Sequence, residues 1–340
     1  MADLQQGAVR GLALVTGATG LVGNSVVRHL LADGHSVRVL VRPTSDPRAL
    51  VGLTVQRVVG DVRDRHAAAR AVAGVERVYH AAALVRVGTR GLQEFREVNV
   101  EGVRVVAQAT REVGARLVHV SSVDTLGFGT RAEPAHEETP PDASIRFPYV
   151  VSKREAEVAV KREIDRGLDA VIVNPAYLLG PWDWKPSSGR LLLRIARGLG
   201  RIAPPGGNDF CHSLDVAAGI VAAADRGVRG ERYILGGEAL SYRDAFALFA
   251  EITGGVTPWL TPSAALIRTA GSLGSMWGWL SGREPELNRG SAALACLPHH
   301  FDDTKARREL GYRSRSAREA AEDGWVWLLE HGYARGARQS

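Results

Sequence analysis

Two side chains that can exchange protons with a substrate lie one helical turn apart in the chain. Tyr149 and Lys153 follow Pro148, and their i, i+4 spacing places both on one face of a predicted helix over residues 149–166. A tyrosine with its reference pKa of about 10 is a poor acid–base catalyst at neutral pH, but a lysine cation beside it should lower that pKa. The spacing therefore predicts that Tyr149 is a catalytic acid or base; the alternative is an amphipathic surface tyrosine.

A pair of serines, Ser121 and Ser122, ends a predicted strand upstream of this helix. Ligands of parallel sheets bind at the carboxyl edge of the strands. A hydroxyl of this pair is therefore placed to hydrogen-bond a substrate oxygen held by Tyr149. Because the chain contains only four lysines, chance rarely produces this combination.

A glycine-rich turn follows the first predicted strand, 12–16, and opens a helix. In such a G-x-x-G-x-x-G loop, Gly17 permits the tight turn, Gly20 lets backbone N–H groups approach a pyrophosphate, and Gly23 lets the helix pack on the strand. The helix N-terminus adds partial positive charge for the phosphates. The predicted contacts with a dinucleotide are Gly17, Thr19, Gly20, Leu21, Val22 and Gly23.

The end of the second predicted strand bears on which dinucleotide is bound. An NAD-selective site places an acid there to accept from the ribose 2′-OH, whereas this chain has Arg42, Thr44 and Ser45, and no acid before Asp46. A guanidinium at Arg42 can pair with a 2′-phosphate. The sequence thus favours NADP(H); the alternative is a solvated loop arginine with NAD(H) as cofactor.

Other candidate cofactor contacts follow later strands. Asp61 can accept from the adenine amine, three consecutive alanines leave room for the nicotinamide ribose, and the Lys153 ammonium can hold that ribose. Asn99 is expected either to anchor backbone or water near Lys153 or to lie on a helix surface. The predicted set is Asp61, Val62, Ala81, Ala82, Ala83, Asn99, Lys153 and Pro175.

Alternating strands and helices must position these groups. Near-continuous Val, Leu and Ile runs predict strands at 12–16, 36–41, 55–59, 75–79, 117–121 and 170–174. Helical spacing occupies 21–33, 64–73, 91–113 and 149–166. The alternation predicts an α/β fold with a doubly wound, Rossmann-like parallel sheet. Residues 91–113 and 149–166 are also expected to pack across the two-fold axis of a homodimer.

After Pro175 the pattern changes to loops, a strand at 233–235, and helices at 241–253, 263–280, 304–310 and 316–331. We expect a dinucleotide-binding domain over 1–178, to which 211–237 returns, and a smaller, mostly helical substrate lobe over 179–210 and 238–340. The tryptophans suit either an apolar substrate wall or packing between lobes, and His299-His300 is interpreted as loop. The substrate-binding candidates are Arg86, Asp124, Tyr177, Trp182, Trp184 and His212.

Composition limits the classes of partner. The 340 residues carry 43 Lys+Arg and 37 Asp+Glu, a net charge of +6, and the basic residues are interspersed with acids, which disfavours nucleic acid. Cys211 and Cys296 are too few for a disulfide framework, and the histidines lack metal-ligand spacing, so no metal is predicted. With no apolar run long enough to span a bilayer and no signal peptide, a cytoplasmic enzyme with a small-molecule substrate is expected.

Together these motifs resemble the extended short-chain dehydrogenase/reductase family, the NAD-dependent epimerase/dehydratase family, and within it dihydroflavonol-4-reductase-like proteins and hopanoid-associated sugar epimerases. The resemblance runs from Val15-Thr16-Gly17 to His331-Gly332-Tyr333 and includes Val173-Asn174-Pro175 and Gly180-Pro181. It implies that Ser122, Tyr149 and Lys153 form the catalytic trio, with hydride moving to or from a nicotinamide.

The resemblance leaves several reactions open. Sugar dehydratases of the family carry adjacent Asp and Glu after the serine, and Val123 and Asp124 supply only one acid, which disfavours dehydration. An epimerase retains NAD and has no use for a 2′-phosphate clamp, so Arg42 favours net oxidoreduction of a ketone or aldehyde to an alcohol, or the reverse. A sugar or nucleotide-sugar epimerase is the alternative, followed by an inactive NAD(P)-sensing protein.

Overall fold

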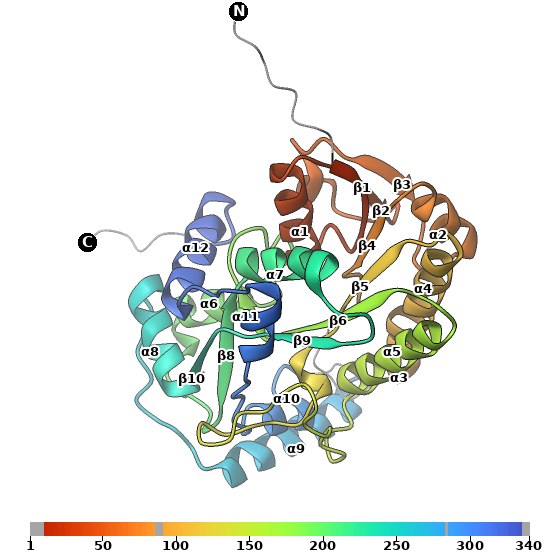
Figure 1. The fold of residues 1–340 in the computed structure, drawn as a ribbon. Coiled ribbons are helices and arrows are strands. Elements are labelled where there is room, and N and C mark those ends of the chain that lie inside the picture. The colour runs from red at the N-terminus through yellow and green to blue at the C-terminus, as the bar shows by residue number, and fades with distance from the viewer. Residues whose placement is uncertain (1–9, 86–90, 283–284, 335–340) are drawn as a thin grey trace, which may run out of the picture.

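A computed structural model describes residues 10–85, 91–282 and 285–334. Its centre is a seven-stranded parallel sheet in the order β3-β2-β1-β4-β5-β6-β9 (Figure 1). The strands are rich in Val, Leu and Ile, and all six residues of β6 are buried, as expected for a sheet covered on both faces. The bounds are β1 Arg10–Thr16, β2 His35–Val41, β3 Gln56–Val59, β4 Arg77–His80, β5 Arg116–Val120, β6 Ala170–Pro175 and β9 Arg232–Leu235.

Helices cover both faces of this sheet and bury two separate apolar cores. One face carries α1 (Leu21–Ala32), α7 (Ser213–Arg226) and α11 (Thr304–Leu310). The other carries α2 (Arg65–Val72), α4 (Gly102–Glu112) and α5 (Pro148–Asp165). The predicted doubly wound, Rossmann-like architecture is therefore confirmed.

The long helix expected over 91–113 has an irregular start. It consists of α3 (Leu92–Phe95), a π-helical segment η2 (Arg96–Glu101) and α4. A π-helical turn widens the backbone locally and turns side chains out of the regular helical register. Asn99 is the buried residue of this segment.

A smaller lobe packs beside the carboxyl edge of the large sheet. It contains α6 (Arg190–Arg194), η4 (Ile195–Leu199), α8 (Tyr242–Thr253), α9 (Ala264–Ser281), α10 (Arg289–Leu294) and α12 (Ala317–Glu330). It also contains strands that the sequence did not predict: β7 (Tyr177–Leu179), β8 (Gly207–His212) and β10 (Glu238–Ser241), in the order β10-β8-β7. They are three to six residues long, too short to give a clear alternating pattern.

The parallel arrangement brings distant turns to one edge. β1 pairs with β4, β4 with β5 and β5 with β6, all in parallel. The loops after these strands begin at Gly17, Ala81, Ser121 and Ala176, so they gather at the carboxyl edge of the sheet. Two short 3-10 helices, η1 (Pro47–Leu50) and η3 (Val123–Thr125), lie in loops that follow β2 and β5.

Candidate functional site

The glycine turn is held in place by its own packing. Gly17 has a φ of +71°, and a Cβ there would lie 2.6 Å from the backbone of Ala81 and Ala82. A Cβ on Gly23 would overlap the carbonyl oxygen of Gly17. At Gly20, which is exposed, the nearest atom to such a Cβ would be 3.5 Å away. Packing thus requires glycine at 17 and 23, whereas Gly20 keeps the backbone of the turn open to a ligand.

The start of α1 has the electrostatics of an anion site. No side chain caps its first turn and no acidic residue lies in it. Its backbone N–H groups and partial positive charge suit a pyrophosphate, so these residues fit the predicted dinucleotide. Beside the turn, the Thr16 hydroxyl lies 2.9 Å from His80 Nδ1 and accepts from the backbone N–H of Ala82 at 3.3 Å. These bonds fix the predicted alanine segment against Gly17.

In the loop after β2, Arg42 is exposed to solvent, whereas the nearest acidic residue, Asp46, is already paired with another side chain. Arg42 is exposed, and its backbone N–H donates to the Ser45 hydroxyl at 3.1 Å. Asp46 caps η1 and pairs with Arg48 at 2.7 Å. Hydrogen bonds from Arg48 lower the pKa of Asp46 to about 2. The first carboxylate after the strand is therefore already engaged by a cation.

Asp61, the predicted adenine contact, is likewise paired. Its two carboxylate oxygens accept from Arg63 at 2.8 and 3.1 Å. The Arg63 hydrogen bond is the largest influence lowering the pKa of Asp61, and the charge of Arg42 adds to it. Arg42 and Asp61 therefore lie near one another at the ends of adjacent strands, and an adenine amine would have to share the carboxylate with Arg63.

The groups predicted to react are brought together at the end of β5. Ser122 lies close enough to the Tyr149 hydroxyl to act on it and to lower its pKa. The Ser122 hydroxyl also lies 3.3 Å from a carboxylate oxygen of Asp124 and accepts from the Asp124 backbone N–H at 3.2 Å. A hydroxyl–hydroxyl–carboxyl cluster of this kind can bind a carbonyl oxygen and exchange a proton with it.

The charge state of Tyr149 differs from the expectation. Burial is the largest influence, and together with the nearby Asp124 it raises the pKa of Tyr149, against the opposing hydrogen bond from Ser122. The Lys153 ammonium is buried and donates to the carbonyl of Val120 at 2.7 Å. Burial lowers the pKa of Lys153 to about 8. The prediction of a lowered pKa for Tyr149 is therefore wrong, because burial and the charge of Asp124 raise it.

A buried carboxylate supports this cluster and was missed by sequence reasoning. Glu157 accepts from Ser121 at 2.5 Å, from Thr125 at 2.8 Å and from Asn174 at 2.9 Å, and pairs with Arg232 at 2.8 Å. It lies one turn beyond Lys153 on α5, so the spacing 149, 153, 157 was the available signal. Glu157 ties the end of β5 to the same helix that carries the tyrosine.

Asn99 anchors backbone and is fully engaged. Its amide oxygen accepts from the Leu84 N–H at 2.7 Å, and its amide nitrogen donates to the Leu84 carbonyl at 3.1 Å and to Ser152 at 2.9 Å. Of the two roles considered, the anchoring one is supported, and a direct cofactor contact stays a prediction. Through Asn99, the loop after the alanines is joined to the turn of α5 that precedes Lys153.

The predicted substrate residues separate into two groups. Asp124 lies at the reacting cluster, whereas Arg86 is outside the described residues. Tyr177 donates to the carbonyl of Ser188 at 3.2 Å and packs on Phe210 with ring centroids 5.3 Å apart. It therefore belongs to the core of the smaller lobe.

The two tryptophans join the lobes. The Arg28 guanidinium of α1 lies 3.3 Å from the centroid of the Trp182 ring. Trp184 packs edge-to-face on Trp327 of α12 within the smaller lobe, with centroids 5.0 Å apart, and the Arg48 guanidinium from the loop after β2 lies 5.8 Å from its ring centroid. These contacts support the alternative considered for both residues, packing between lobes, whereas a role in a substrate wall stays a prediction.

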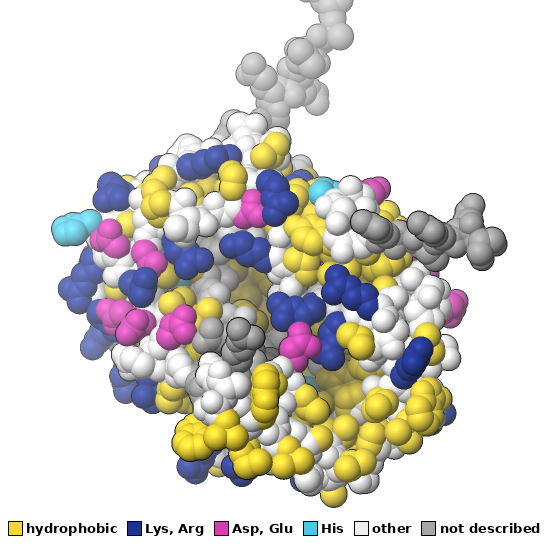
Figure 2. Space-filling view, turned by 180° about the vertical axis from the view of Figure 1, so that it is seen from behind, with side chains coloured by type: hydrophobic (Ala, Val, Ile, Leu, Met, Phe, Trp, Pro, Cys, Tyr) yellow, Lys and Arg dark blue, Asp and Glu magenta, His cyan; other side chains and the backbone are white. Residues whose placement is uncertain are grey.

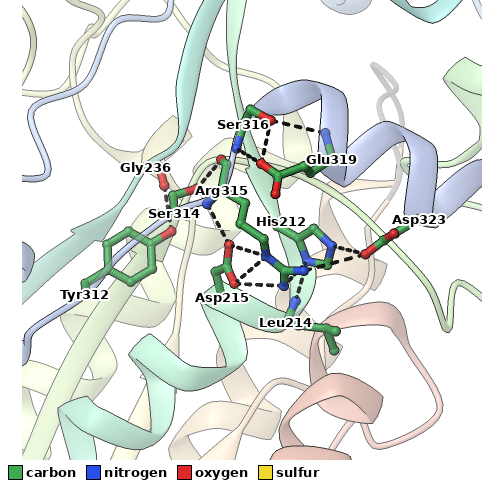
Figure 3. A network of polar contacts seen from close by, with 10 residues as sticks. All are labelled: His212, Leu214, Asp215, Gly236, Tyr312, Ser314, Arg315, Ser316, Glu319 and Asp323. Atoms are coloured by element: carbon green, nitrogen blue, oxygen red, sulfur yellow. Dashed lines mark hydrogen bonds and ion pairs between the residues drawn. The ribbon is translucent and has the colours of Figure 1, made fainter. Parts of the chain in front are cut away.

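His212 belongs to a structural network between α7 and α12 (Figure 3). Its Nε2 lies 3.0 Å from Asp323, and its Nδ1 accepts from the Leu214 backbone N–H at 3.1 Å. Arg315 lies 3.1 Å from that same Nδ1 and 2.8 Å from Asp215. Because both ring nitrogens have partners here, the prediction that His212 binds substrate is corrected.

Two other residues take the place of these candidates beside Asp124. The charges of Asp124 and the buried His299 act on one another. Burial raises the pKa of Asp124 and lowers that of His299, which favours the neutral form of each. Asp124 and burial also raise the pKa of Tyr242, whose hydroxyl accepts from Asn208 at 3.2 Å. No sequence pattern linked 124 with 242 or 299, because these positions are far apart in the chain.

In the part of the chain that the structure describes, no three His, Cys, Asp or Glu side chains gather in a way that could hold a metal ion.

Comparisons with known proteins agree with this geometry. Residues 13–236 match the model of the NAD dependent epimerase/dehydratase family. The chain is 39% identical over 323 residues to sterol demethylase protein B of Methylococcus capsulatus, covering 94% of this chain and 98% of that protein. It is 33% identical over 337 residues to a putative dihydroflavonol 4-reductase of Synechocystis, covering 94% and 95%. The crystal structure of gox2253 superposes with a TM-score of 0.85 at 36% identity, covering 96% of this chain and 100% of that one.

Proposed function

Because the chain belongs to the NAD-dependent epimerase/dehydratase family, we propose that it is an NADP(H)-dependent oxidoreductase that interconverts a ketone or aldehyde and an alcohol. The observation that carries the proposal is that Tyr149 at the start of α5 and Ser122 at the end of β5 lie close enough for the serine hydroxyl to lower the pKa of the phenol. Both lie at the carboxyl edge of the sheet that also carries the glycine turn. A nicotinamide bound on that turn would supply or accept the hydride.

The protein's own groups supply the proton and orient the oxygen. In reduction, the carbonyl oxygen accepts hydrogen bonds from Ser122 and Tyr149. As the oxygen gains negative charge, the Tyr149 O–H bond breaks and its proton completes the alcohol. Burial raises the pKa of Tyr149, so the hydroxyl stays protonated at neutral pH, which is the state that reduction requires. The hydrogen bond from Ser122 stabilises the phenolate that remains.

The preference for NADP(H) rests on the loop after β2. Arg42 is exposed there, and Asp46 is paired with Arg48 and so does not offer a free carboxylate to a ribose 2′-OH. A 2′-phosphate would give Arg42 a charge-assisted partner, which NAD(H) lacks.

The substrate that we propose is a ring or lipid-like ketone. We expect the substrate to lie beside Asp124, whose charge acts on His299 and on the aromatic Tyr242, and the His299 ring packs against Phe128 with centroids 4.7 Å apart. Apolar and aromatic surroundings with a few polar groups suit such a molecule. The names of the similar sterol demethylase protein and dihydroflavonol reductase point to the same class.

The second candidate is a nucleotide-sugar epimerase, because the family includes that activity. It would need a clamp for a diphosphate, and basic residues of the 185–194 segment are the candidates in sequence. Arg194 pairs instead with Glu286 at 2.8 Å. This pairing weighs against the clamp and in favour of net oxidoreduction.

One experiment separates the two candidates. The purified protein is analysed by mass spectrometry for retained cofactor and then assayed for NADPH oxidation with a panel of cyclic and aromatic ketones. We expect little retained cofactor and turnover of at least one apolar ketone. Stoichiometric NAD in the purified protein, with no net NADPH oxidation, would instead identify an epimerase.

A further inference from the structure

Helix α9 presents its large apolar side chains to solvent. Trp277 is 55% exposed, Trp279 73% and Leu280 69%, and Leu266, Leu273 and Met276 are also more than half exposed. Residues 266, 273, 277 and 280 recur at helical spacing and form one stripe. A helix that packs on a soluble protein normally turns such a stripe toward the core.

The opposite face of α9, which does pack on the protein, is made of glycines. The buried residues of α9 are Gly271 and Gly278. Gly271 lies so close to Asn288 that an added Cβ would stand 2.8 Å from its carbonyl oxygen. The burial pattern of α9 is therefore the reverse of the usual one. Its smallest residues contact α10 and the segment before it, and its largest apolar residues face the solvent.

The apolar surface continues into the segment that precedes the helix. Trp259 is 69% exposed, and Leu260 is bridged to the exposed Ile202 of a neighbouring segment. We call Trp259, Leu260, Leu266, Leu273, Met276, Trp277, Trp279 and Leu280 the α9 surface. Figure 2 shows hydrophobic side chains along the lower edge of the molecule, where Figure 1 places α9.

The charges around this surface are basic. The eighteen residues of α9 include no acid and one arginine, the exposed Arg268. Arg201 and Arg289 are exposed at its margins: the Arg201 carbonyl accepts from Trp259 at 3.1 Å, and the Arg289 backbone N–H donates to Ser275 at 2.8 Å. The nearby acid Glu286 is neutralised by Arg194. Apolar side chains rimmed by arginine complement an anionic lipid surface.

We propose that the α9 surface docks on an anionic phospholipid bilayer, with the tryptophans at the level of the headgroups. Trp and Arg are the residues that membrane interfaces favour, because each combines an apolar body with a polar end. The protein lies on the bilayer rather than crossing it, since no helix among the described residues is both long and apolar enough to span a membrane.

Helix α9 is separated from the candidate site by α10, which packs on it. Gly290 of α10 packs against Phe147, the residue that precedes α5 and lies two positions before Tyr149. Beyond α10, the Cys296 thiol lies 3.9 Å from the carbonyl of Ala264 at the start of α9, and the chain then reaches His299. A bilayer under α9 would therefore lie on the side of the molecule where an apolar substrate is proposed to enter. The docking itself does not depend on the proposed reaction.

Vesicle flotation tests the proposal on the full chain. Phosphatidylcholine vesicles with and without phosphatidylglycerol are compared, and tryptophan quenching by brominated lipid is recorded. We expect binding to the vesicles that contain phosphatidylglycerol, weakening with salt, and quenching on binding. The variant W277S/W279S/L280S should lose at least about tenfold in binding, because it removes three apolar anchors. R268E should weaken binding to the anionic vesicles more than to neutral ones.

The control is V51S/V228S/V326S, which removes three exposed apolar side chains elsewhere. It should bind vesicles as the unmodified protein does, and thermal unfolding should confirm that all variants are folded. Absence of binding to the anionic vesicles, or equal loss in control and test variants, would overturn the proposal. So would a change of oligomeric state in W277S/W279S/L280S with unchanged lipid binding, because the face would then be a contact between copies of this chain.

Discussion

The two sides of the reacting cluster are built in different ways. The cofactor side comes from turns that directly follow β1, β2, β3 and β4, and its groups are contiguous motifs such as Gly17–Gly23. The proposed substrate side involves single residues, Asp124, Tyr242 and His299, which are far apart in the sequence yet near enough in the fold for the charge of Asp124 to act on the other two. A site made of contiguous turns can be recognised in a sequence, whereas one assembled across a lobe boundary cannot.

Tyr149 lies where the two sides meet, and its loss should have the largest effect. Tyr149→Phe removes the proton donor alone, so kcat should fall by about a hundredfold to ten-thousandfold while NADPH affinity stays nearly unchanged. Steady-state kinetics and cofactor titration measure the two quantities. Unchanged turnover would show that the catalytic assignment is wrong.

Glu157 should stabilise the fold around the reacting cluster, because it bonds to several residues at the end of β5 and on β6 and β9. Glu157→Ala leaves the half-buried Arg232 without its carboxylate partner and removes the acceptor of three hydrogen bonds, so the free energy of unfolding should fall by about 3 kcal/mol. Chemical denaturation measures this change. Glu157→Asp should recover part of the stability and of kcat together, as expected for a positioning residue; a stable but fully inactive Glu157→Asp variant would point to a direct catalytic role instead.

A substitution of Arg42 tests the proposed cofactor contacts without changing the reacting cluster. Arg42→Ala should weaken NADPH binding by about tenfold and leave NADH nearly unaffected, because only the 2′-phosphate is lost as a partner. The matched variant is Arg48→Ala, which frees Asp46 and should improve NADH binding relative to NADPH. Equal effects of Arg42→Ala on both cofactors would refute the phosphate-binding role.

A substitution of His299 tests the proposed substrate contacts without changing the proposed cofactor contacts. His299→Ala should raise KM for the ketone by about threefold to tenfold and leave the dissociation constant of NADPH unchanged, because its contacts are with Asp124 and Phe128. His136→Ala, an exposed histidine elsewhere, is the control. A loss of cofactor affinity in His299→Ala would contradict the separation of the two sides.

The smallest predicted effect is a pH dependence from Lys153. Burial lowers its folded-state pKa to about 8, so the ammonium is lost as pH rises through that value, and NADPH binding should weaken by a few-fold above it. The free energy of unfolding should change in the opposite direction. Above about pH 8 the folded chain has lost the Lys153 proton while the unfolded chain still holds it, so this residue makes the protein more stable as the pH rises. Fluorescence titration of NADPH binding across this pH range measures the effect. The variant Lys153→Met should lack this pH dependence.

Sequence reasoning was most successful where function depends on local backbone. The strands, the flanking helices and the glycine turn follow from short-range patterns, and the structure confirms the predicted doubly wound sheet. The 149/153 spacing likewise placed the tyrosine and lysine on one helix. The same reasoning missed β7, β8 and β10, left the role of Trp182 and Trp184 open between a substrate wall and packing between lobes, and proposed as a substrate contact His212, which is buried in a polar network.

The sequence by itself determined which residues could do chemistry and which turn could hold a pyrophosphate, because spacing along a helix or turn fixes which groups are neighbours. The tertiary structure alone decided the charge of Tyr149, the partners of His212 and the outward stripe of α9. These properties depend on burial and on contacts between segments distant in sequence, and neither is encoded in a local pattern.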